Sequence, residues 1–131
     1  MIATILYIED NPDNMTLIQR VVESLGCTFV GINTGREGLR LAAALEPDLV
    51  LLDVNLPDID GYAVAQAMRS SGDPYLMYVP VIAITANALR GEADRAFAAG
   101  CDVYMSKPVN IRELRARILS FLEITKSSET G

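Results

Sequence analysis

The chain has no histidine, no tryptophan and only two cysteines among its 131 residues. The missing histidine excludes Ser-His-Asp and Cys-His catalysis, histidine-ligated zinc and a phosphohistidine within this chain. If phosphoryl groups pass through the protein, their donor therefore lies on another molecule. Cys27 and Cys101 lie far apart and form no CxxC spacing, which predicts buried, reduced thiols and a cytoplasmic location.

Long apolar runs and an excess of positive charge are also missing. No apolar stretch approaches the ~18 residues of a membrane span, and the amino terminus lacks the features of a signal peptide, so we expect no membrane insertion. The formal net charge of −6 argues against a nucleic-acid partner and favours a protein partner. The 50% hydrophobic content suffices for one domain over residues 1–125, followed by a flexible tail over residues 126–131.

The hydrophobic pattern alternates between strands and helices along the whole chain. Short apolar runs predict strands over residues 4–8, 27–31, 48–53, 80–84 and 102–106. Apolar residues at helical spacing occupy three of the intervals, at Met15, Ile18, Val22 and Leu25, at Leu39, Ala42, Ala43 and Leu45, and at Ile111, Leu114, Ile118 and Leu122. A further helix is predicted over residues 62–70, where the turn residues 71–74 end it.

Two of the predicted helices differ in how firmly they should be held. The third helix carries Ala63, Ala67 and Met68 on its expected buried side. Residues 86–99 are helical by composition, but they are poor in large apolar side chains and contain Gly91, which costs about 1 kcal/mol relative to alanine inside a helix. This segment is therefore predicted to be the least firmly held.

Short apolar runs between helices are typical of buried parallel strands, and right-handed crossovers place the helices on both faces of such a sheet. The predicted fold class is α/β. We expect a flavodoxin-like (βα)5 three-layer sandwich, with a five-stranded parallel sheet in the order 2-1-3-4-5.

Three of the predicted strands end in charged residues. Glu9 and Asp10 follow the first strand, Asp53 ends the third, and Lys107 follows the fifth. Because an open parallel sheet binds ligands where the carboxyl ends of its strands converge, these side chains should share one pocket. Two carboxylates ~4 Å apart repel by roughly 4 kcal/mol at an effective dielectric of about 20. One lysine cannot neutralise three carboxylates, so either one acid is protonated or a divalent cation, with magnesium favoured by oxygen ligands, completes the site.

Taken together, the residues that follow the strands resemble the receiver domain of two-component response regulators. The matching features are Glu9-Asp10, Asp53, the loop over residues 56–61, Thr85 after the fourth strand, and Lys107-Pro108. The resemblance extends from the first strand through the last helix. The run over residues 85–91 is similar to receivers of single-domain regulators and of hybrid sensor kinases. The sequence leaves open which of the two this chain is, although its start at Met1, directly before the first strand, favours a natural beginning.

The resemblance implies an aspartyl phosphorylation site. Asp53 matches the phosphoacceptor, and a carboxylate is a competent nucleophile. Glu9, Asp10, Asp53 and the backbone carbonyl of Asn55 match the ligands of magnesium (Mg2+), for which manganese (Mn2+) is a possible substitute. Lys107 would bring positive charge to the incoming phosphoryl group. On its own, the acidic pair before the first helix could instead serve to stabilise the helix dipole, and both roles are compatible.

The resemblance also implies a conformational switch. Thr85 would donate its hydroxyl to a phosphoryl oxygen, and Tyr104 would then move inward, although a tyrosine at a strand end is more often half-buried packing. A cis peptide is implied before Pro108. Asn55 and Asn87 match positions that influence the lifetime of the acyl phosphate. The implied partners are a sensor histidine kinase or a histidine phosphotransfer protein as phosphoryl donor, and a downstream protein target.

Other functions remain open on the residues alone. A magnesium phosphohydrolase shares the scaffold and the covalent intermediate, but Asn55 stands where its second carboxylate is expected. A flavin or nucleotide carrier needs a phosphate-binding loop rich in Gly, Ser or Thr after the first strand, where this chain has acidic residues. A constitutive interaction module would keep the fold without phosphorylation. The resemblance favours a protein that is no enzyme beyond catalysing its own phosphorylation and dephosphorylation.

Overall fold

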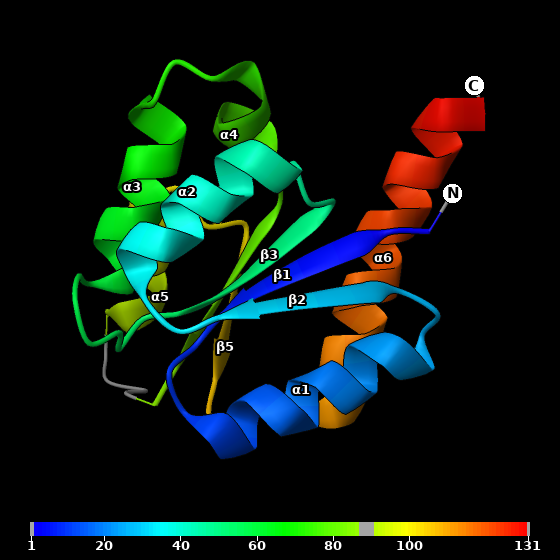
Figure 1. Ribbon diagram of the computed structural model, residues 1–131, viewed down its shortest axis with the longest axis horizontal. Coiled ribbons are helices and arrows are strands. Elements are labelled where there is room, and N and C mark those ends of the chain that lie inside the picture. Colours follow the sequence, from blue (N-terminus) through cyan, green and yellow to red (C-terminus); the bar gives the residue numbers. More distant parts are fainter. Residues whose placement is uncertain (1, 87–90, 131) are drawn as a thin grey trace.

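The computed structural model describes residues 2–86 and 91–130, with the side chains of residues 124–130 left out. The elements in chain order are β1 (Thr4–Ile8), α1 (Pro12–Ser24), β2 (Thr28–Ile32), α2 (Gly35–Leu45), β3 (Leu49–Asp53), α3 (Gly61–Ser70), α4 (Pro74–Tyr78), β4 (Val81–Thr85), α5 (Glu92–Ala98), β5 (Val103–Ser106) and α6 (Ile111–Thr130). All strand pairs are parallel, and the sheet has the order β2-β1-β3-β4-β5 (Figure 1). The predicted fold class and strand order are confirmed.

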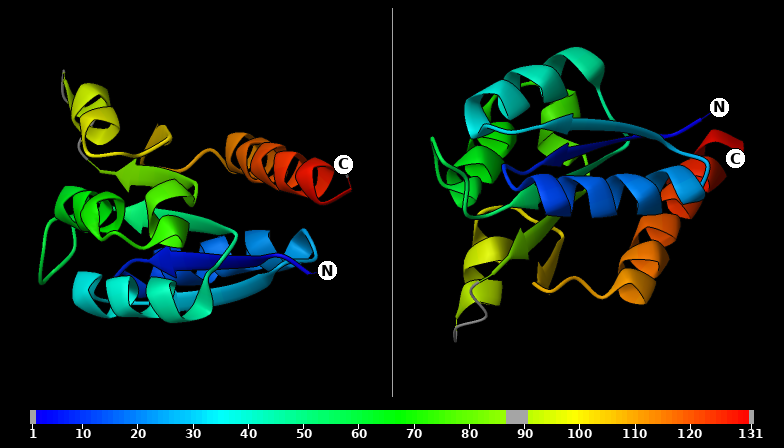
Figure 2. Two further views of the ribbon diagram at one scale, coloured as in Figure 1. Left: turned by 90° about the horizontal axis from the view of Figure 1, so that it is seen from above. Right: turned by 60° about the horizontal axis from the view of Figure 1, so that its bottom comes forward.

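The sheet is the middle of three layers (Figure 2). Successive side chains of a strand point to opposite faces, so β1 contributes Leu6 and Ile8 to one hydrophobic core and Ile5 and Tyr7 to the other. The first core lies under α2, α3, α4 and α5, and the second lies under α1 and α6. Every residue of β3 and β4 is buried, as expected for central strands of a parallel sheet covered on both faces.

Side-chain caps mark the starts of α1, α2, α3 and α4. Asn11 accepts a hydrogen bond from the backbone N–H of Asn14 at 3.0 Å, and Pro12 occupies the first turn of α1, where its missing N–H costs no hydrogen bond. Strand boundaries differ from the predicted ones by at most one residue at either end. Within residues 2–86 and 91–130, no helix is both long enough and apolar enough to cross a membrane.

The short helix α4 was not predicted. The sequence predicts Asp73 and Pro74 in the turn that ends α3, whereas in the structure Asp73 caps a new helix by accepting the backbone N–H of Tyr75 at 2.9 Å. The helix has 5 residues, too few to show a helical period in the sequence. Arg69 of α3 holds its end, because the guanidinium donates to the carbonyl oxygens of Leu76 and Val79 at 3.0 and 2.8 Å.

Two helices differ from their predicted extent or orientation. In the described part of the segment predicted as helix over residues 86–99, α5 begins at Glu92, because Gly91 has φ 90° and ends up as its N-cap; residues 87–90 lie outside the described residues. In α3, Ala63 is exposed, contrary to its predicted burial, because Tyr62, Val64, Ala65 and Met68 form the buried face.

The last helix, α6, extends over residues that the sequence assigned to a tail. Its backbone is helical from Ile111 to Thr130, including residues 126–130. Leu114 and Ile118, which were predicted on its apolar face, are fully buried in the core shared with α1. The flexibility of residues 126–131 stays a prediction.

Candidate functional site

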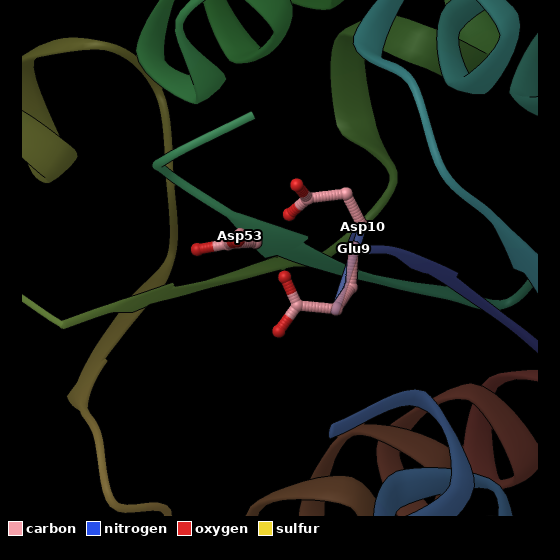
Figure 3. A group of neighbouring side chains, drawn as sticks. All are labelled: Glu9, Asp10 and Asp53. Atoms are coloured by element: carbon pink, nitrogen blue, oxygen red, sulfur yellow. The ribbon is translucent and has the colours of Figure 1, made fainter. Parts of the chain in front are cut away.

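The charged residues that follow the strands do meet at one edge of the sheet. Glu9 directly follows β1, Asp53 and Thr85 are the last residues of β3 and β4, and Lys107 directly follows β5. One carboxylate oxygen from each of Glu9, Asp10 and Asp53 lies within 4.8 Å of the other two, and the three side chains surround one space (Figure 3). The charged side chains that the sequence predicted to share one site therefore do lie together.

Glu9 is the most enclosed of the three acids. Its side chain is 0% exposed, and Oε1 accepts hydrogen bonds from Lys107 Nζ at 2.9 Å, Asn14 Nδ2 at 2.8 Å and the Tyr7 hydroxyl at 3.1 Å. Its other oxygen, Oε2, is buried and receives no hydrogen bond from any residue that the structure describes. A buried oxygen without a hydrogen bond costs about 1–3 kcal/mol of folding free energy, and more when it is charged. A proton or a cation bound to Glu9 Oε2 would remove this cost.

Asp53 lies deep in the same cluster. Its side chain is 2% exposed, Lys107 Nζ lies 3.4 Å from Oδ1, and the backbone N–H of Asn55 donates to Oδ1 at 3.2 Å. Burial and the neighbouring Glu9 carboxylate raise the pKa of Asp53 to about 7. Burial alone would also raise the pKa of Glu9, but its interactions with Asp53, Lys107 and Asn14 hold that pKa below its ordinary value. Of the two buried acids, Asp53 is therefore the one that takes up a proton more readily.

Lys107 supplies the positive charge of the site. Burial disfavours its ammonium form, but the carboxylates of Glu9 and Asp53 outweigh this and raise the pKa of Lys107. Its backbone N–H donates to the carbonyl oxygen of Thr85 at 2.7 Å, which ties the segment after β5 to the end of β4. The peptide bond between Lys107 and Pro108 is cis, the isomer that the resemblance implied.

The donor atoms fit a hard divalent cation. Two buried carboxylates and the exposed carboxylate of Asp10 offer oxygen only, and Glu9 Oε2 has an unused lone pair. Asn55 lies two residues beyond Asp53, and its backbone N–H donates to Asp53 Oδ1. The backbone carbonyl of Asn55 therefore belongs to the same turn as Asp53. A cation bound here would offset the like charges and remove the need for the proton on Asp53.

Two close contacts hold the loop between β3 and α3 in place, one through Asp58 and one at Gly61. Asp58 accepts the backbone N–H groups of Gly35 and Arg36 at 2.7 and 2.9 Å, and so caps the start of α2 from outside. A Cβ on Gly61 would lie 2.5 Å from the backbone oxygen of Asp53, so only glycine permits this approach. The sequence indicated this segment as a loop that matches the receiver family, but not these contacts.

The predicted switch residues lie beside this site. Thr85 is fully buried, and Tyr104 is half-buried on β5, packed against the core cluster that also contains Tyr62. Their role as a switch stays a prediction. Asn87, to which a lifetime role was assigned, lies outside the described residues.

A second polar cluster, which the sequence reading missed, joins α3 to α5. The Tyr62 hydroxyl donates to Glu92 Oε2 at 2.5 Å, and the Glu92 side chain is 10% exposed. The Arg95 guanidinium lies 4.7 Å from the centre of the Tyr62 ring and 3.4 Å from Glu92 Oε1. Tyr62 and Glu92 are 30 positions apart and form no motif, so no local signal indicated their contact.

Known proteins resemble this chain over nearly its full length. The sequence profile of the response regulator receiver domain matches residues 5–119. The polar-differentiation response regulator DivK of Brucella ovis is 35% identical over 122 residues, which cover 93% of this chain and 98% of DivK.

Two solved structures show the same fold. The receiver domain of a sensor histidine kinase from Pseudomonas aeruginosa PAO1, which has a magnesium ion coordinated in its active-site cleft, is 33% identical with a TM-score of 0.84, and the match covers 94% of this chain and 99% of that one. The signal receiver domain of a histidine kinase from Syntrophus aciditrophicus is 29% identical with a TM-score of 0.83, over 92% and 90% of the two chains.

Proposed function

The chain belongs to the response regulator receiver domain family of two-component signalling, and from this premise we propose that it accepts a phosphoryl group on Asp53. The observation that carries the proposal is the meeting of Asp53, Glu9 and Lys107 at one strand edge, with a buried carboxylate oxygen left unpaired. A carboxylate oxygen of Asp53 forms the new bond to phosphorus, and the bond from phosphorus to the donor imidazole nitrogen breaks.

The cation of the proposed reaction is Mg2+, with Mn2+ as a substitute of the same ligand preference. Glu9, Asp10, Asp53 and the carbonyl of Asn55 would hold it. The magnesium in the Pseudomonas receiver and the oxygen-only donor set here support this assignment. When bound, the cation supplies positive charge for the phosphoryl oxygens and keeps Asp53 ionised.

Lys107 and Thr85 position the incoming group. The Lys107 ammonium already lies between Glu9 and Asp53, so a phosphoryl group on Asp53 comes within its reach. The hydroxyl of Thr85, at the end of the neighbouring strand β4, binds a second phosphoryl oxygen. Positioning and charge neutralisation supply the catalysis of phosphoryl transfer to Asp53. We propose that the protein catalyses only its own phosphorylation and dephosphorylation.

The output of the proposed reaction is a population shift. Movement of Thr85 toward the phosphoryl group lets Tyr104 turn inward, and the surface around α5 then changes. Asn55 and Asn87 set how long the acyl phosphate survives. The contact between Tyr62 and Glu92 lies at the start of α5, so it takes part in any change of that surface.

Receiver domains generally interact with histidine kinases and with downstream targets. For this chain the proposed donor is the phosphohistidine of a sensor histidine kinase or of a histidine phosphotransfer protein, because the chain has no histidine of its own. The proposed output partner is a downstream protein. A reducing cytoplasm is the proposed location, supported by the unpaired thiols of Cys27 and Cys101.

Intact mass spectrometry tests the proposal. Incubation with acetyl phosphate and Mg2+ should add one phosphoryl mass, and chelation of the metal or the substitution Asp53→Asn should prevent the gain. An equal gain in Asp53→Asn would show that another residue is modified and would overturn the assignment.

A further inference from the structure

Tyr7 places a hydroxyl in the middle of an otherwise apolar core. The residue is 0% exposed and belongs to the core beneath α1 and α6. Its ring meets the ring of Phe29 edge to face, with centroids 6.5 Å apart. A buried hydroxyl needs a polar partner, and here the partner is Glu9 Oε1 at 3.1 Å. Tyr7 and Glu9 are two positions apart, so they point to the same face at the end of β1.

The two carboxylate oxygens of Glu9 differ in their hydrogen bonds. Oε1 receives Tyr7 from β1, Asn14 from α1 and Lys107 from the segment after β5, whereas Oε2 receives no donor among the described residues. The terminal torsion of a glutamate is broad and two-fold, so a carboxylate without such contacts samples many orientations. Three donors from three elements fix the plane of the group and select the oxygen that stays open.

Lys107 differs from the other two donors. Its ammonium is shared with Asp53 at 3.4 Å and is the group that the proposed reaction directs to the phosphoryl oxygens. The amide of Asn14 and the hydroxyl of Tyr7 are neutral, and their contacts with Glu9 do not involve Asp53. They are therefore the donors that can hold Glu9 before and after phosphorylation.

We propose that Tyr7, together with Asn14, is a positioning residue for the divalent cation: it holds Oε1 of Glu9 so that Oε2 is presented to the metal. This inference deepens the proposed function and rests on it. Hydrogen bonds that orient a metal-ligating side chain typically change metal affinity by about 10–100-fold when they are removed. Because Asn14 and Lys107 remain, the loss of Tyr7 alone should lie near the lower end of that range.

The test compares Mg2+ binding by isothermal titration calorimetry among the full-length wild type, Tyr7→Phe, Asn14→Ala and Tyr75→Phe. Phenylalanine keeps the ring at position 7 and removes only the hydroxyl. Tyr75→Phe is the matched control, since its hydroxyl is buried and has no hydrogen-bond partner among the described residues. We expect binding about tenfold weaker in Tyr7→Phe, weaker binding in Asn14→Ala, and a wild-type dissociation constant in Tyr75→Phe.

Two further readouts separate positioning from a structural role. Addition of Mg2+ should perturb the near-ultraviolet absorption of Tyr7, and this difference spectrum should be lost in Tyr7→Phe but kept in Tyr75→Phe. Phosphorylation by acetyl phosphate should be slower in Tyr7→Phe at limiting Mg2+ and should reach the wild-type rate at saturating Mg2+. If the hydroxyl only stabilises the fold, its removal would lower the thermal midpoint but leave the Mg2+ affinity and the phosphorylation rate at limiting Mg2+ unchanged.

The outcomes distinguish this inference from the proposed function. If wild type binds Mg2+ and Tyr7→Phe binds it with the same dissociation constant, the positioning role is wrong and the proposed function stands. If wild type binds no Mg2+, both are wrong. Should Tyr7→Phe fail to fold, Asn14→Ala decides: weaker Mg2+ binding supports the positioning of Glu9, and unchanged binding overturns it.

Discussion

Replacing Asp53 with asparagine should stabilise the metal-free protein by an amount that grows with pH. Burial and the Glu9 carboxylate raise the pKa of Asp53 from 3.8 to about 7 in the folded protein. The unfolded chain releases this proton near the lower value, so between the two values the unfolded state binds fewer protons than the folded state. Folding stability therefore falls as the pH rises through this window. Asparagine carries no titrating proton, so Asp53→Asn removes this pH dependence.

The size of the effect follows from the two pKa values. Since one pKa unit corresponds to about 1.4 kcal/mol, the advantage of Asp53→Asn in free energy of unfolding should grow by about 2–3 kcal/mol between about pH 5 and about pH 8. Glu9 contributes in the opposite sense, because its pKa is lowered in the folded protein and its ionised form is favoured. The value is therefore an upper bound for the coupled pair.

Urea unfolding in the presence of a chelator measures this difference directly. Both proteins should be compared at several pH values, because titration of the carboxylates distant from Asp53 then cancels in the difference. Saturating Mg2+ should remove the disadvantage of the wild type, since a bound cation takes over the role of the proton on Asp53. A difference in unfolding free energy that stays constant with pH would refute the electrostatic reasoning for the site.

Three further substitutions test other parts of the structure. Tyr62→Phe should speed amide hydrogen exchange at the start of α5 and cost about 1–3 kcal/mol of stability, because it leaves Glu92 without its buried donor; unchanged exchange would contradict this contact. Gly61→Ala should lower both stability, by about 1–3 kcal/mol, and the rate of phosphorylation, because its Cβ would press on the backbone of Asp53; wild-type values in both assays would rule out the close approach. Arg69→Met should lower the free energy of unfolding, measured in urea, by about 3 kcal/mol, because it leaves the backbone carbonyls of Leu76, Val79 and Gly100 without their donor. The Mg2+ affinity should stay at the wild-type value. A loss of stability below about 1 kcal/mol would contradict these hydrogen bonds.

The sequence was most informative where function depends on the ends of strands. Asp53 and Lys107 were placed in one pocket because they follow buried apolar runs, and parallel strands bring such positions to the same edge. The hydrogen bond from Tyr7 to Glu9 was not predicted. Side chains alternate along a strand, which puts both residues on one face, and this pattern could have indicated the contact.

Other features had no local signal. The contact of Tyr62 with Glu92 depends on how α3 and α5 pack, and neither residue carries a motif. Composition favoured a helix around Gly91, but the backbone there takes φ 90°, which only the three-dimensional path of the chain determines. The predicted buried face of α3 was wrong because a small residue such as Ala63 fits either face of a helix.

The most direct test of the central claim is to locate the phosphoryl group in the chain. Phosphorylated protein can be reduced with borohydride, which converts an aspartyl phosphate to homoserine, and then digested and sequenced by tandem mass spectrometry. We predict homoserine at position 53, dependent on Mg2+. Conversion at Asp10 or at another carboxylate, with residue 53 unchanged, would contradict the account.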